Sequence, residues 1–229
     1  MTGISVVVWD WNGTLLDDVD VCFATINTVL TTNGCAALPD LAAYRRSFCF
    51  PVSRYYENVG FDFARTPFAV LADQFMSLYH PAAAHCALQP GAVETLAALQ
   101  ARGLRQVLLS ASLQEHLELQ AARYPIAGYF DRLLGIGDIY AKSKQQLACD
   151  FVRGCGAAPR QVLFIGDSVH DFEVAQACGC PCVLYAGGHQ ARAALAATGS
   201  PVIEALAQLP GLLGAEAPAR KEANGTKRI

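Results

Sequence analysis

Charged residues are scarce in this chain of 229 residues, and neither sign dominates. They make up 16% of the sequence, and 17 basic against 20 acidic residues leave a formal net charge of -3. Because there is no excess of positive charge, we expect no nucleic-acid partner. Hydrophobic residues make up 53% of the chain, which is too many for intrinsic disorder and predicts a folded protein.

The sequence also lacks long apolar runs, and its first residues do not have the pattern of a secretory leader. Asp10, Asn12 and Asp17 interrupt the first apolar run before the roughly 20 residues that span a bilayer, so we expect no membrane partner. The first residues contain no basic region followed by an apolar one, and the nine cysteines are an odd number. We therefore expect a cytoplasmic protein with reduced thiols, and we interpret the cysteines of the ACGCPCVL segment as core residues and not as zinc ligands.

Four apolar runs end in small or polar residues, as buried parallel strands do. These runs are residues 4–9, 104–110, 161–166 and 181–185. In the second half of the chain, segments with helical spacing alternate with them, at 92–101, 113–123, 145–153 and 171–177. This alternation predicts an α/β fold with a doubly wound parallel sheet, in which ligands bind beyond the carboxyl ends of the strands.

Residues 18–86 break this alternation. Three segments, 19–32, 39–48 and 66–79, have helical spacing with no apolar strand between them. We therefore predict a helical domain of residues 18–86 inserted into a sheet domain of residues 1–17 and 87–215, with residues 81–85 as the return linker. The last residues, 216–229, are polar and aperiodic and are expected to form a mobile tail.

The first predicted strand ends at Asp10 in the sequence WDWNGTLLDD. A carboxylate at such a position can act as a nucleophile, while Gly13 permits close approach of the backbone to a ligand and Thr14 offers a hydroxyl. An Asx-Gly turn after a strand is also ordinary loop chemistry. Taken alone, the motif leaves both interpretations open.

Two further strand ends carry polar groups. Asp167 and Asp171, in IGDSVHD, together with Asp10 provide oxygen ligands that suit Mg²⁺, although the pair would also cap the start of a helix. Ser110, in VLLSAS, and the backbone amides after it can hold a phosphoryl oxygen. Lys144, in AKSKQQL, can place an ammonium near Asp10, with Lys142 as its rival, although an isolated lysine is usually a solvated charge.

In this order, the segments WDWNGTLLDD, VLLSAS, SKQQL and IGDSVHDFEVAQACG resemble the four motifs of the haloacid dehalogenase superfamily. The resemblance implies a Rossmann-like core with a C1 helical cap and a magnesium-dependent mechanism through an aspartyl phosphate. The implied substrate is a small phosphorylated metabolite, such as a sugar phosphate or a phosphoglycolate-like acid.

The resemblance also implies a role for each matching residue. Asp10 would be the nucleophile, and Mg²⁺ would be held by Asp10, the backbone carbonyl of Asn12, Asp167 and Asp171. The phosphoryl oxygens would be held by Thr14, Ser110, Ala111 and Lys144. The cap would contact the rest of the substrate, for which the candidates are Arg45, Arg46, Arg54 and Tyr55. About half of such arginines simply face water, and His189, in AGGHQ, lies near the expected mouth of the site.

Asn12 departs from the family pattern, because phosphatases of this family carry an aspartate there as general acid and base. An amide cannot exchange that proton, and the lost catalysis is worth about 10²- to 10⁴-fold. We prefer the hypothesis that Asp17, His170 or a cap residue shuttles the proton, or that the leaving group needs none. Two alternatives are deamidation of Asn12 and binding of a phosphorylated ligand without turnover.

Other reactions of the superfamily are less compatible with the sequence. Dehalogenation uses the matching aspartate without a metal, and the paired Asp167 and Asp171 argue against it. Cleavage of a carbon–phosphorus bond resembles a family that needs a cap lysine, and residues 18–86 contain none. A regulatory or ligand-binding protein with little turnover stays the alternative to an enzyme, and the sequence does not indicate an oligomeric state.

Overall fold

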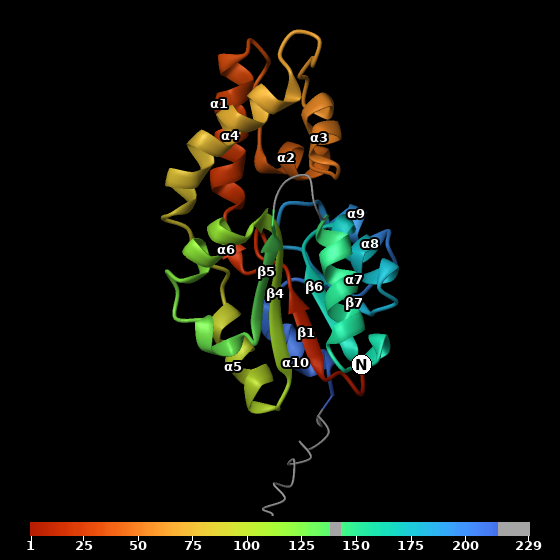
Figure 1. The fold of residues 1–229 in the computed structure, drawn as a ribbon. Coiled ribbons are helices and arrows are strands. Elements are labelled where there is room, and N and C mark those ends of the chain that lie inside the picture. The colour runs from red at the N-terminus through yellow and green to blue at the C-terminus, as the bar shows by residue number, and fades with distance from the viewer. Residues whose placement is uncertain (138–142, 215–229) are drawn as a thin grey trace, which may run out of the picture.

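A central parallel sheet organises the molecule. The computed structural model describes residues 1–137 and 143–214, so the predicted tail and Lys142 lie outside it. The strand order β5-β4-β1-β6-β7-β8 confirms the predicted Rossmann-like, doubly wound fold (Figure 1). The strands are β5 (Arg132–Ile136), β4 (Arg105–Leu113), β1 (Val6–Trp9), β6 (Val162–Gly166), β7 (Cys182–Tyr185) and β8 (Val202–Ile203).

Helices cover both faces of the sheet because every side chain of its central strand is buried. Val7 and Trp9 of β1 belong to the core under α5 (Ala92–Ala101), α6 (Gln114–Ala121) and α10 (Leu209–Leu212). Val6 and Val8 belong to the core under α7 (Lys144–Gly154), α8 (Val169–Ala177) and α9 (Arg192–Ala196). None of the helices in the described segments is long and apolar enough to cross a membrane.

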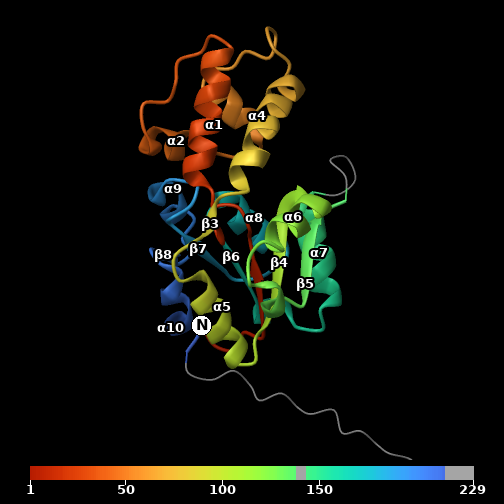
Figure 2. The same ribbon diagram turned by 90° about the vertical axis from the view of Figure 1, so that its left-hand side faces the viewer.

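A group of helices lies beyond one end of the sheet and packs around its own apolar core (Figures 1 and 2). These cap helices are α1 (Val19–Thr32), α2 (Leu41–Ser47), α3 (Val52–Asn58) and α4 (Phe68–Ala83). The short antiparallel strands β2 (Leu16–Asp17) and β3 (Ala87–Leu88) pair where the chain leaves the sheet and where it returns. This ribbon supports the proposed cap boundaries at residues 18 and 86. The short 3-10 helices are η1 (Ala127–Tyr129), η2 (Pro159–Gln161) and η3 (Leu206–Gln208).

The cap differs from the sequence prediction at two places. Helix α4 continues through Pro81 to Ala83, so the prediction of a linker over residues 81–83 was wrong. Proline removes one backbone donor, but the alanines after it are strong helix formers and Ala83 packs into the cap core at 2% exposure. Helix α3 was not predicted, and it buries Tyr55 and Tyr56.

Candidate active site

The predicted acidic residues meet where the strand order of the sheet reverses direction along the chain. Asp10 follows β1 and Asp167 follows β6, and the N–H of Asp10 donates to the carbonyl of Ile165 at 2.8 Å. Asp171 lies in the first turn of α8, where it forms a capping box with Ser168, as the helix-capping interpretation predicted. One carboxylate oxygen from each of the three aspartates lies within 4.8 Å of the others.

Lys144, the first residue of α7, reaches this cluster from a neighbouring helix. Its Nζ contacts Asp10 Oδ1 and lies 2.6 Å from Asp171 Oδ1. Burial, only partly offset by Lys144, raises the pKa of Asp10 to about 8, and burial raises the pKa of Asp167 to about 6. Burial also disfavours ionised Asp171, but the charge and hydrogen bond of Lys144 hold its pKa below the usual value. The single positive charge of Lys144 does not balance the charge of the three aspartates when all are ionised, so the cluster can bind a further cation.

The turn after β1 packs tightly against this cluster. Thr14 Oγ1 lies 3.2 Å from Asp10 Oδ2 and 3.1 Å from Asp167 Oδ1. Gly13 has φ +73°, and a Cβ there would lie 2.5 Å from Asp167 Oδ2. A Cβ on Gly188 would lie 2.1 Å from the same oxygen. These two glycines therefore let two loops close around Asp167, because any larger residue would collide with its carboxylate.

The end of β4 also reaches the turn after β1. Ser110 is buried, and its Oγ accepts a hydrogen bond from the Ser112 N–H at 3.0 Å. The Ser112 hydroxyl donates to Asn12 Oδ1 at 3.3 Å. Ala111, between the two serines, is exposed. The structure thus brings Ser110 and Ala111 to the strand end that contains Asn12.

The side chain of Asn12 is held by residues that the sequence did not single out. Its Nδ2 donates to Asp18 Oδ2 at 2.9 Å and to Tyr79 Oη at 2.7 Å. The Tyr79 hydroxyl donates to the same Asp18 oxygen at 2.6 Å. A carboxylate only accepts hydrogen bonds, so the NH₂ group of Asn12 must face Asp18. Both amide protons are thereby committed, and none is available to a reacting group.

Asp18 is the centre of a buried ion pair between the cap and the sheet domain. Its Oδ1 lies 3.2 Å from His189 Nε2, and the other ring nitrogen lies 2.9 Å from Tyr44 Oη on α2. Burial favours neutral His189, but Asp18 outweighs it and raises the pKa of the imidazole to about 9. Burial also opposes ionised Asp18, whose pKa is nevertheless lowered by His189. The backbone N–H of His189 donates to Asp167 at 2.6 Å, which links this pair to the carboxylate cluster.

The two named candidates for a replacement proton donor lie elsewhere. Asp17 is exposed and accepts a hydrogen bond from Gln89 at 3.3 Å. His170 lies 3.5 Å from Glu173 and stacks on Phe50. Within the described segments, no hydrogen bond joins either candidate to Asp10, so the geometry supports neither as a proton shuttle.

The cap residues predicted to bind substrate occupy different environments. Arg45 donates to the carbonyls of Gly188 and Gly187 at 2.9 and 3.1 Å, so it ties α2 to the loop after β7. Arg46 and Arg54 are exposed. Tyr55 is buried in the aromatic core of the cap at 3% exposure. The substrate contacts of these four residues stay predictions.

Comparisons with known proteins identify a family by sequence and a shared fold by structure. A sequence model described as haloacid dehalogenase-like hydrolase matches residues 4–179. The phosphoglycolate phosphatase of Escherichia coli K12 is 36% identical over 97 residues, which are 42% of this chain and only 38% of that relative. That of Pseudomonas putida is 29% identical over 214 residues, covering 90% of this chain and 78% of the relative. A haloacid dehalogenase-like protein of Streptococcus pneumoniae has the same fold, with a TM-score of 0.78 at 16% identity over 92% of this chain and 98% of that one.

Proposed function

Because this chain belongs to the haloacid dehalogenase-like hydrolases, we propose that it hydrolyses a small phosphate monoester with Asp10 as the nucleophile. The observation that carries the proposal is the convergence of Asp10, Asp167, Asp171 and Lys144 in one buried cluster. Asp10 attacks phosphorus, the bond from phosphorus to the alcohol oxygen breaks and the alcohol leaves, and water then hydrolyses the aspartyl phosphate to free Asp10 and inorganic phosphate. Similarity to phosphoglycolate phosphatases supports a small acidic metabolite as the substrate.

The donor set fits Mg²⁺. Asp10, Asp167 and Asp171 bring three buried carboxyl groups together, and their oxygens are the hard ligands that this ion prefers. Asp10, Asp167, Asp171 and the backbone carbonyl of Asn12 would hold it. When bound, Mg²⁺ would screen the repulsion between a carboxylate nucleophile and a phosphate dianion.

The remaining groups of the site position the transferring phosphoryl group. Lys144 is held as a cation, because Asp10 and Asp171 outweigh burial and raise its pKa. Its ammonium, the Thr14 hydroxyl, the Ser110 hydroxyl and the Ala111 amide would bind phosphoryl oxygens. Phosphoryl transfer depends mainly on such positioning and electrostatic stabilisation.

Asn12 limits the range of substrates. Its amide protons are bound to Asp18 and Tyr79, so the leaving oxygen receives no proton from this position. We therefore expect turnover to be fastest with esters whose leaving group is weakly basic. The same observation favours a second candidate function, a phospho-ligand-binding protein with little turnover.

A panel of phosphomonoesters tested with Mg²⁺, beside the variant Asp10→Asn, separates the two functions. Phosphate release by the wild type that is at least 10²-fold above the variant for one or more esters is the expected result. Release no greater than that of Asp10→Asn with every ester would refute the hydrolase and leave ligand binding as the better account.

A further inference from the structure

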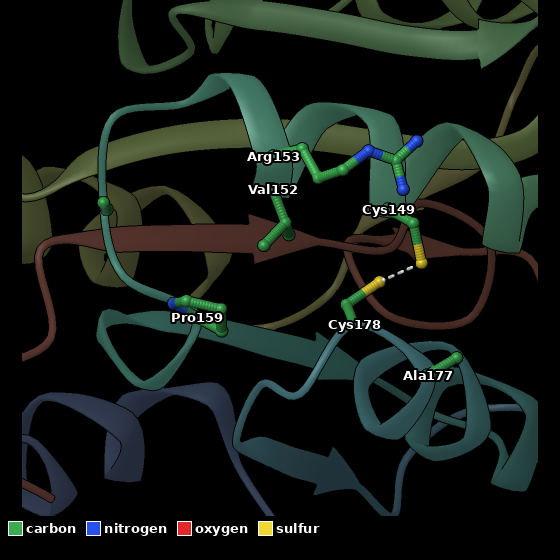
Figure 3. A pocket seen from close by; sticks show the side chains of 7 residues that line it. Cys149, Val152, Arg153, Pro159, Ala177 and Cys178 are labelled. Carbon is green, nitrogen blue, oxygen red and sulfur yellow. Dashed lines mark hydrogen bonds between the residues drawn. The ribbon is translucent and has the colours of Figure 1, made fainter.

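Two thiols meet outside the active site, between α7 and α8. The Sγ atoms of Cys149 and Cys178 are 2.8 Å apart, closer than two non-bonded sulfur atoms normally approach. Figure 3 shows the two side chains pointing toward each other, Cys149 from α7 and Cys178 from the residue that directly follows α8. Within the described part of the chain, the clusters of three or more metal-binding side chains do not include either cysteine. The arrangement therefore suits a disulfide bond and not a metal site.

A small molecule can reach this pair. Both cysteines are half-buried, in contrast to the buried core residues Cys180 and Cys182. A cavity of about 290 Å³ adjoins them, and Arg153 and Pro159 are among its other lining residues (Figure 3). The core prediction thus holds for Cys180 and Cys182, while Cys178 lies at the wall of a cavity.

We propose that Cys149 and Cys178 form a reversible disulfide by exchange with a small-molecule disulfide. The thiolate of one cysteine attacks the reagent and releases one reagent thiol. The thiolate of the other cysteine then attacks the mixed disulfide and releases the second. The two cysteines lose two protons and two electrons, and the reagent is reduced to two thiols.

The bond would lock together two helices that supply the active site. Lys144 begins α7 and Asp171 lies in the first turn of α8, and these two side chains already form an ion pair at the N-terminal ends of the two helices. A covalent link stabilises the fold mainly by restricting the unfolded chain. Burial, together with the hydrogen bond to Cys149, raises the pKa of the Cys178 thiol, so the close approach of the sulfurs and not a low pKa favours the bond.

Peptide mapping of the full chain tests the proposal with oxidised glutathione as the probe. Trypsin, which cleaves after lysine and arginine, releases Cys149 in peptide 145–153 and Cys178 in peptide 161–192. The expected product is these two peptides joined under non-reducing conditions, with a mass about 2 Da below their sum. The denatured protein should then contain two fewer free thiols than its nine cysteines.

Matched variants identify the partner, because peptide 161–192 also contains Cys180 and Cys182. The link should persist in Cys180→Ser and disappear in Cys149→Ser and Cys178→Ser. The thermal midpoint of the linked wild type should rise by about 5–10 °C and return on reduction. The wild-type map needs no substitution, so a variant that misfolds does not prevent the test.

Three results would overturn the proposal. The first is a fully oxidised wild type that carries separate glutathione adducts and no link. The second is a linked peptide that persists in Cys178→Ser. The third is a thermal midpoint that stays unchanged after linkage, which would show that the bond does not stabilise the fold.

Discussion

Replacing Asn12 by aspartate converts the proton-inert position of the site into a proton donor. In the wild type, Nδ2 lies 2.9 Å from Asp18 Oδ2 and 2.7 Å from Tyr79 Oη. A carboxyl group at position 12 would lie about as close to the Asp18 carboxyl as this amide does, so the two groups would not ionise independently. Together they would retain one proton at a pH well above the usual carboxyl pKa. General acid catalysis is worth about 10²- to 10⁴-fold. For an alkyl phosphate, whose leaving alkoxide needs a proton, we expect kcat to rise by about 10²-fold.

Steady-state phosphate release with Mg²⁺ measures this effect. p-Nitrophenyl phosphate is the comparison substrate, and its weakly basic leaving group should make the gain in Asn12→Asp less than about 10-fold. Asn12→Ala is the matched control that removes the amide without adding an acid, and it should gain nothing. In the double variant Asn12→Asp with Asp18→Asn, the neighbouring carboxylate that keeps the new carboxyl group protonated is removed. The gain with the alkyl ester should therefore shrink.

Two outcomes would refute this reasoning. An equal gain with both esters would show that proton donation to the leaving group is not the missing step. A loss of activity in Asn12→Asp would show that the amide has a catalytic role of its own, or that a second carboxylate cannot be accommodated beside Asp18.

Three further predictions concern stability and metal binding. Burial raises the pKa of Asp10 to about 8 and that of Asp167 to about 6, from an ordinary carboxyl pKa of 3.8. Without metal, the protonated carboxyl groups therefore stabilise the fold fully below pH 3.8, and this stabilisation is lost as the pH rises through 6 and 8. Since Mg²⁺ needs ionised ligands, thermal-shift assays should show a larger Mg²⁺-dependent rise at pH 8 than at pH 6. Tyr79→Phe leaves buried Asp18 short of a donor and should cost about 1–3 kcal/mol in urea unfolding. Gly13→Ala forces a Cβ toward Asp167 at positive φ and should cost a similar ~1–3 kcal/mol while weakening the Mg²⁺-induced shift; an unchanged midpoint in either variant contradicts the contact it tests.

The parts of the fold that were predictable are those with long or regular patterns. The runs over β1, β4, β6 and β7 were recognised because buried parallel strands are nearly continuous apolar segments. The five residues of β5, RLLGI, include an arginine and a glycine, so periodicity could not distinguish them from a loop. Helix α3 has only seven residues between Pro51 and Gly60, whereas the equally short α2 lies within a longer segment, 39–48, that has helical spacing.

Predictability of the site follows the same division. The proximity of Asp10 and Asp167 was predictable from the sequence, because parallel strands present their carboxyl ends at one edge of a sheet. Lys144 was predictable as a site residue only from the order of the four motifs, because the sequence around it also contains Lys142. The contacts of Asp18 with Tyr79 and His189 were not predictable, because they depend on how α4 and a distant loop pack across the domain junction.

Asn12 and Asp18 are best understood as one unit. The amide is neutral, and the carboxylate of Asp18 accepts hydrogen bonds from it and from Tyr79 and pairs with His189. If both positions were acidic, one would have to stay protonated in a site that already holds three other buried carboxylates. The neutral side chain at position 12 therefore lets the Asp18–His189 pair join the cap to the loop after β7. The same neutral side chain deprives the reaction of a proton donor. The expected consequence is a rate that depends steeply on the basicity of the leaving group, which a Brønsted plot over a series of aryl and alkyl phosphates would measure. A flat plot would show that the neutral side chain at position 12 serves the Asp18–His189 pair without costing the reaction a needed proton.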